Sequence, residues 1–377
     1  MKSKLHLFLI LVFGAIVSSG CTSVAGLVGM NQKCVVIAKR ASVRSSGAVV
    51  AADVLEVTRG QTLEVLDEMT YENEKWYNVR ASDEEQTEGW IEARYVMTQN
   101  LLEKSQKLAD EDREIPAQAA GQLRAASNLR LSPDRTTDDN ILFKMLGGDT
   151  FEIVGWKRVP KTDEVEKDDA PKGGANNQAG KNGSQPKQKD HNAPLQVDDK
   201  YDTWYKVRLD PSVSPAPAGW IYGKQVELSV PADIIFYRTG REFVAWRRLD
   251  GDEPGNASFM KRGKDAARED KPGSWVILEK SNTLQEPDGE EPDFDRILVL
   301  GYDKYNQDHY KVYRSGNVKG FLPLRLTGSG DSRVFSVRLK DAGGQFIDVQ
   351  FQIFKDARGN LKVKVPDNIP KDEKRGD

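Results

Sequence analysis

Residues that could perform nucleophilic or acid–base chemistry are few in this sequence. Beyond the apolar N-terminal segment there are two histidines, His191 and His309, and the cysteines are Cys21 and Cys34. A papain-type hydrolase needs a thiolate and an imidazole held together by the fold, yet Cys34 and His309 are separated by most of the chain. His191 lies in a stretch almost without apolar residues. We therefore predict no catalytic residue and no enzymatic activity.

Carboxylates are plentiful, and their clusters occupy turn-like stretches at 83–88, 166–169 and 286–295. Paired carboxylates can hydrolyse glycosidic bonds, but runs of this kind are typical of solvated loops. The run at 286–295 lacks the residue order of an EF-hand calcium loop. No Cys/His cluster indicates zinc, and no glycine-rich phosphate loop joins a strand to a helix. We expect no metal and no cofactor.

A pair of aromatic phrases occurs twice. WYNVR (76–80) is followed by GWIE (89–92), and WYKVR (204–208) is followed by GWIY (219–222). Each copy is preceded by the same shorter motifs in the same order, which are SVR (42–44) and GQTLEVL (60–66) in the first copy and SNLR (127–130) and GDTFEIV (148–154) in the second. The chain therefore contains two units of one type.

The phrases themselves have the composition of strands. Alternation along a strand places Tyr77 and Val79 on one face and Trp76 on the other, and it separates Trp90 from Ile91 in the same way. A unit of about 60 residues has a marginal core, so large aromatic side chains must supply much of it. The repeated pattern predicts small all-β units in which some tryptophans serve packing.

Both copies resemble the bacterial SH3-like (SH3b) domain, a small β-barrel that occurs in tandem in cell-envelope proteins. The resemblance covers essentially the whole of each unit and implies ligand binding through a groove lined by aromatic residues between two variable loops. The candidate ligand-binding residues that it implies are Tyr71, Trp76 and Trp90 in the first unit and Trp156, Tyr201, Trp204 and Trp220 in the second. The implied partner is peptidoglycan or an envelope protein.

In the C-terminal part, residues 276–326 contain a weaker copy of these motifs. HYKVY (309–313) stands in the place of WYKVR, and GFLPL (320–324) in the place of GWIE, so that His309 and Phe321 replace the two tryptophans. The stretch is either a degenerate third SH3-like barrel or a different β module.

The expected fold class is all-β, with tandem SH3-like barrels and a β-rich C-terminal module. The expected parts are a signal peptide at 1–20, barrel 1 at 34–98, a partly helical linker at 99–121, barrel 2 at 122–230, a C-terminal module at 231–366 and a disordered tail at 367–377. Barrel 2 carries an insertion at 160–200 that is rich in Gly, Asn, Lys and Asp. Such a composition cannot bury enough apolar surface to offset the entropy of ordering, so disorder is expected there.

The N-terminus has the pattern of a bacterial lipoprotein signal. Lys2 and Lys4 precede an apolar core that is too short to span a membrane, and small residues lead directly to Cys21. The interpretation is that Cys21 is lipidated and anchors the protein to a membrane of the cell envelope. In a Gram-negative cell, Thr22 favours the outer membrane, facing the periplasm. The alternative is an ordinary secretory signal.

Charge restricts the partners further. Without residues 1–20 the chain has 53 basic and 58 acidic residues, a net charge of −5, which argues against nucleic acid. The sequence thus favours a non-catalytic, membrane-anchored lipoprotein that binds peptidoglycan or a protein through its SH3-like units. Two alternatives stay open: an enzyme with its active site in 231–377 that the barrels target, and a structural scaffold subunit of an envelope complex.

Overall fold

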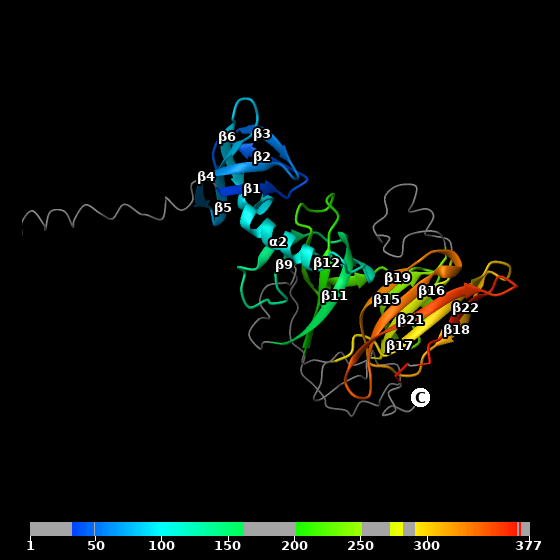
Figure 1. Ribbon diagram of the computed structural model, residues 1–377. Coiled ribbons are helices and arrows are strands. Elements are labelled where there is room, and N and C mark those ends of the chain that lie inside the picture. Colours follow the sequence, from blue (N-terminus) through cyan, green and yellow to red (C-terminus); the bar gives the residue numbers. More distant parts are fainter. Residues whose placement is uncertain are drawn as a thin grey trace, which may run out of the picture. The chain divides into compact units, whose positions relative to one another are not determined.

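The computed structural model describes residues 32–48, 50–161, 201–250, 272–281, 291–367 and 369–370, and these are predominantly strands (Figure 1). The expected all-β class is confirmed. The signal peptide, Cys21, nearly all of the insertion at 160–200 and most of the tail lie outside the described residues. The chain forms two compact units, Met1–Leu102 and Glu103–Asp377.

The first unit contains one antiparallel sheet, which we call module 1. Its elements are β1 (Gln32–Val36), β2 (Arg40–Arg44), β3 (Asp53–Thr58), β4 (Thr62–Tyr71), β5 (Glu74–Ala81), β6 (Glu88–Glu92), the 3-10 turn η2 (Ala93–Tyr95) and β7 (Val96–Thr98). The strand order is β3-β2-β6-β5-β4-β1-β7. All seven strands contribute side chains to one buried apolar cluster, so the sheet curves around its inner face.

Module 2, at the start of the second unit, repeats this arrangement. Its elements are β8 (Ala119–Leu123), β9 (Ser127–Arg130), β10 (Ile141–Met145), β11 (Thr150–Pro160), β12 (Tyr201–Arg208), β13 (Ala218–Tyr222), the turn η3 (Gly223–Gln225) and β14 (Val226–Leu228). The order β10-β9-β13-β12-β11-β8-β14 is that of module 1, strand for strand. Irregular pairing also falls at equivalent places, after Val65 in β4 and after Ile153 in β11. The two units of the sequence are two copies of one topology.

A single helix, α2 (Gln99–Glu111), lies between the two sheets in sequence, as the Leu-, Lys- and Gln-rich composition predicted. Within the second unit the Ser105 hydroxyl donates to the Ala218 carbonyl at 2.6 Å and accepts from the Ala218 N–H at 3.2 Å. The helix is thereby tied to β13. β8 begins at Ala119, inside the stretch that was expected to be linker.

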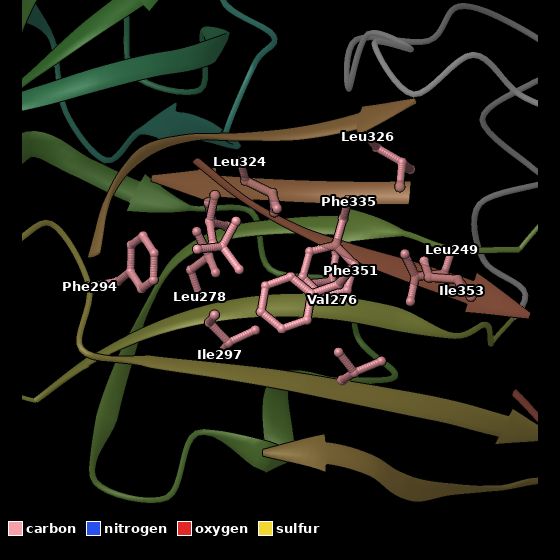
Figure 2. Packing of buried hydrophobic residues seen from close by; sticks show 14 of the residues in the cluster. Leu249, Val276, Leu278, Phe294, Ile297, Leu324, Leu326, Phe335, Phe351 and Ile353 are labelled. Atoms are coloured by element: carbon pink, nitrogen blue, oxygen red, sulfur yellow. The ribbon is translucent and has the colours of Figure 1, made fainter. Parts of the chain in front are cut away.

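The C-terminal part is a sandwich of two four-stranded antiparallel sheets. One has the order β15 (Arg241–Arg248), β16 (Trp275–Ser281), β17 (Arg296–Asp303), β18 (Asp308–Arg314), and the other β19 (Gly320–Thr327), β20 (Val334–Lys340), β21 (Phe346–Lys355), β22 (Leu361–Lys364). Figure 2 shows the shared core, in which Phe335 and Phe351 stack with ring centroids 4.5 Å apart. These two rings belong to neighbouring strands of one sheet, and Tyr313 of the other sheet packs on Phe351 at 5.8 Å, so that apolar burial between the sheets holds them together.

The stretch 276–326 does not repeat the order of the two modules. Its strands β16, β17 and β18 belong to one sheet of the sandwich, whereas β19 belongs to the other. The reason is visible in β16, where neighbouring residues on opposite faces, Val276 and Ile277, are both fully buried. A strand covered on both faces suits a central position in a packed sheet. The different β module is therefore the arrangement found.

Candidate functional site

In each module the two tryptophans of the aromatic phrases share one face of the sheet. Trp76 on β5 lies opposite Glu92 on β6, and Asn78 lies opposite Trp90. Alternation therefore directs Trp76, Asn78 and Trp90 away from the core cluster, which receives Val79 from the same strand. We call the surface formed by Trp76, Asn78 and Trp90 the outward face of module 1.

Trp76 is nevertheless only 5% exposed, because the β2–β3 loop lies over it. A methyl group added to Gly47 of this loop would meet the Met69 methyl and the Trp76 indole. Arg44, at the end of β2, holds the loop by donating to the Ala51 carbonyl at 3.0 Å. The indole is thus the floor of the outward face and not a projecting contact.

The equivalent loop of module 2 is held by the equivalent arginine. Arg130 donates to the Thr137 carbonyl at 2.6 Å and to the Asn140 side chain at 2.7 Å. This fixed loop carries Arg135, whose guanidinium lies 4.5 Å from the centre of the Tyr222 ring. Cation–π attraction and the partly buried hydrogen bonds of Arg130 together set the position of the loop.

Below that loop, Trp204 and Tyr222 form a buried aromatic pair. Their ring centroids are 5.5 Å apart, and Trp204 is 2% exposed. Tyr222 donates its hydroxyl proton to Asp202 at 2.9 Å. Burial, together with that carboxylate, raises the pKa of Tyr222 to about 12, so the phenol is a neutral donor at physiological pH. Trp76 and Trp204 are thus both buried, but Trp204 packs on Tyr222, whereas Glu92 stands at that position in module 1.

On the outward face of module 2, which contains Lys206 and Trp220, the lysine is held by the chain itself, whereas Trp220 is half-buried. Lys206 forms ion pairs with Glu111 at 3.5 Å and Asp112 at 2.5 Å, at the end of α2. Arg208, also on β12, donates to the carbonyls of Asp112 at 3.0 Å and Ile115 at 3.2 Å. The segment Glu111–Ile115 therefore lies along β12 and is held there through both its backbone and its side chains.

At the position of Lys206, module 1 has Asn78. The side-chain oxygen Oδ1 of Asn78 is buried without a hydrogen-bond partner among the described residues. A buried acceptor that lacks a donor costs about 1–3 kcal/mol. Beside it lies Trp90, which is half-buried and presents part of its indole. The half-buried Trp90 indole is therefore the feature of module 1 most suited to a ligand.

The arginine at the next outward position is used differently in the two modules. In module 1, Arg80 bonds Glu64 of β4 at 3.2 Å and Glu88 of β6 at 2.6 Å. In module 2, the equivalent Arg208 keeps the corresponding pairing with Glu152 at 3.7 Å, and its other nitrogen holds the covering segment. Ala218 stands where module 1 has Glu88, which leaves that nitrogen available. The charge of Arg80 is thus balanced within module 1.

The remaining candidates do not join these faces. Tyr71 and Tyr201 lie on the surface, 41% and 42% exposed, at the end of β4 and the start of β12. Trp156 is half-buried at the junction with the sandwich, where the Lys280 ammonium group lies 4.2 Å from the centre of its ring. Glu291 completes that junction through ion pairs with Lys280 at 2.8 Å and with Arg158 at 2.9 Å.

His309, the histidine at the degraded motif position, lies in a polar cluster of the sandwich. Its Nε2 atom is 2.8 Å from the Gly273 carbonyl and 3.5 Å from Asp233. The rings of Tyr237 and Tyr302 pack against its ring, with centroids 5.6 Å and 5.1 Å away.

Cys34 is buried in module 1, and burial raises the pKa of its thiol to about 12, which disfavours the reactive thiolate.

None of the described residues forms a group of three or more His, Cys, Asp or Glu side chains that could hold a metal ion. Within the same ranges, no helix is both long and apolar enough to cross a membrane.

Comparisons with known proteins give no family for this chain. No family model matches the sequence, and no curated protein matches it. Among solved structures, NlpC2 and NlpC1 from Trichomonas vaginalis align with 90% of this chain and with 95% and 91% of their own, at 8% and 10% identity. Their TM-scores are 0.15 and 0.14, which is too low for any argument about fold or activity.

Sequence reasoning did not assign a role to the loop-holding arginines or to the segment that covers module 2. For Arg44 and Arg130 a signal was present, since both SVR and SNLR end in arginine at the same place in the repeat. For Glu111–Ile115 no local pattern was available, because its partners on β12 lie more than 90 residues away in sequence.

Proposed function

We propose that this chain is a non-catalytic lipoprotein of the cell envelope, which uses SH3-like modules to bind peptidoglycan or a protein partner. In this proposal a lipid on Cys21 fixes the N-terminus to a membrane. The outward face of module 1 then engages the ligand. Module 2 has the same topology but uses its outward face to hold the segment Glu111–Ile115.

The observation that carries the proposal is the half-buried indole of Trp90 on the outward face of module 1. An indole face suits a sugar ring or a peptide side chain. The occupied face of module 2 supports it, because there Arg208 of the equivalent surface already binds a turn of the chain through its backbone carbonyls.

The test is co-sedimentation of the soluble chain, from Thr22 onward, with purified peptidoglycan sacculi. Retention of the wild-type chain supports the wall as ligand. An absence of retention refutes the wall and leaves the protein partner, which crosslinking through a photoreactive group near Trp90 would identify. Mass spectrometry of the full-length protein purified from bacterial membranes tests the anchor separately, since acylation adds the mass of the lipid to a peptide that begins at Cys21.

A further inference from the structure

The second sheet of the sandwich has one face in the core and one face exposed. Alternation along its strand β21 buries Val349, Phe351 and Ile353 in the shared core (Figure 2). The residues that point the other way are all exposed, namely Phe346, Asp348, Gln350, Gln352 and Phe354. The outer face of the first sheet differs, since its Trp246 and Ile277 are fully buried. The exposed surface therefore belongs to the second sheet.

This exposed surface is strongly basic, although the whole chain has a net charge of −3. Cross-strand register places Arg338 and Lys340 of β20 beside one end of the β21 row, and Lys362 and Lys364 of β22 beside the other end. Arg325 of β19 joins the same surface, opposite Ser336 of β20. Among the strands of this sheet, Asp348 is the one acidic residue. We call the outward residues of β19 to β22 the basic face.

Internal ion pairs do not cancel this charge. Arg338 contacts Asp348 at 3.2 Å, with 47% and 67% of the two side chains exposed. Lys362 lies 3.8 Å from Asp356 of the following turn, and half of the lysine side chain is exposed. Exposed pairs of this kind contribute little to stability, so the cations can exchange them for a ligand. Charge complementarity thus favours an anionic partner.

The uncharged residues of the basic face indicate which kind of anion fits. Gln350 and Gln352 form its centre, and their amides can both donate hydrogen bonds to hydroxyl groups and accept them. Phe346 and Phe354 stand at the two ends of the row, roughly 26 Å apart along the strand, with 48% and 38% of each residue exposed. A cation accompanies each ring, because Lys340 is paired with Phe346 and Lys362 with Phe354.

The arrangement suits a long ligand that carries rings, hydroxyl groups and negative charges. β21 is paired with β20 on one side and with β22 on the other, so its backbone cannot accept an added strand and recognition falls to side chains. Phenyl faces stack on the apolar faces of sugar rings, and the central amides match sugar hydroxyls. An anionic bilayer would satisfy the cations but would leave the central amides without specific partners.

We propose that the basic face binds a linear acidic polysaccharide, whose carboxylate or phosphate groups pair with the cations while its sugars lie along β21. The proposal goes beyond the function proposed above, because it needs neither a lipid on Cys21 nor the Trp90 surface of module 1. It gives the second unit a ligand of its own.

The experiment measures the dissociation constant of the chain from Thr22 onward for polygalacturonate, a linear glycan with one carboxylate on each sugar. The wild-type chain binds it and does not bind the fully methyl-esterified polymer, which has the same backbone without the charge. Replacing both lysines of β22, Lys362→Gln with Lys364→Gln, raises the dissociation constant about fivefold. The matched control is Lys104→Gln with Lys107→Gln on α2, which removes two exposed charges elsewhere and leaves the constant unchanged.

A neutral double variant separates a glycan from other anions. Gln350→Ala with Gln352→Ala alters no charge and raises the dissociation constant for polygalacturonate about threefold. Circular dichroism first confirms that each variant is folded. The proposal is overturned if the wild-type chain does not bind polygalacturonate, or if the two lysine variants behave alike. Equal or tighter binding of polyglutamate or of phosphatidylglycerol vesicles also overturns it, in favour of an acidic peptide or a membrane. Trp90→Ala leaves the constant unchanged, so this result and the sacculi result fail separately.

Discussion

Replacement of Gly89 by alanine should open module 1 without disturbing the second unit. The added methyl would lie 2.6 Å from the Arg44 carbonyl oxygen and 2.8 Å from a Val43 methyl. The carbonyl belongs to the paired strand β2 and cannot move aside freely. Overpacking of this kind costs roughly 1–3 kcal/mol.

Cys34 provides the assay, because it is fully buried in module 1 and is the one cysteine in a chain that starts at Thr22. A thiol reagent reaches it only when the module opens. If reclosing is fast, the labelling rate follows the population of the open form. A loss of roughly 1–3 kcal/mol then accelerates labelling about 5- to 150-fold.

The control for this prediction is the equivalent glycine of module 2. A methyl on Gly219 would lie 2.6 Å from the Leu129 side chain, so Gly219→Ala should destabilise module 2 and leave Cys34 labelling at the wild-type rate. Gly155→Ala, where nothing lies within 4 Å of the added methyl, should affect neither module. Wild-type labelling of Gly89→Ala, or equal acceleration by Gly219→Ala, would refute the reasoning.

Three further predictions concern the second unit. Arg130→Ala removes the hydrogen bonds that hold the β9–β10 loop, so the free energy of unfolding measured in guanidinium should fall by about 2–3 kcal/mol. An unchanged midpoint of guanidinium unfolding would contradict this role. The pKa of Tyr222 is raised from 10.0 to about 12, so the stability it contributes is present below pH 10 and lost as the pH rises to about 12. Melting curves of Tyr222→Phe should show a smaller alkaline loss than the wild type, and identical curves would count against the assignment. Phe351→Ala should destabilise the sandwich by about 3–5 kcal/mol, since Phe335 loses its stacking partner; a loss below 1 kcal/mol in the same denaturation assay would argue that the stack is not central.

Much of the fold of the modules follows from local sequence. Alternation within WYNVR places Val79 and Trp76 on opposite faces, and the register agrees with this, with Val79 in the core. The repeat predicts the second copy for the same reason, since identical residue types at matched positions meet the same packing problem. These are properties of single strands and of short turns, which local sequence specifies.

What could not be predicted depends on contacts between distant segments. Alternation gives no reason for Trp76 to be buried, because its cover comes from the β2–β3 loop. Trp156 was expected to bind a ligand, yet it packs under Lys280 of the sandwich, more than 100 residues away in sequence. The C-terminal copy of the motif left two alternatives open, and the strands that carry it, β18 and β19, belong to different sheets.

The central claim is that ligand binding belongs to the outward face of module 1, whereas the same face of module 2 is occupied by its own chain. The most direct measurement is a titration of sacculi with two matched variants, Trp90→Ala and Trp220→Ala, after circular dichroism has shown that both are folded. The account predicts that Trp90→Ala weakens retention tenfold or more and that Trp220→Ala binds like the wild type. Equal weakening by the two variants, or weakening by Trp220→Ala alone, would contradict it.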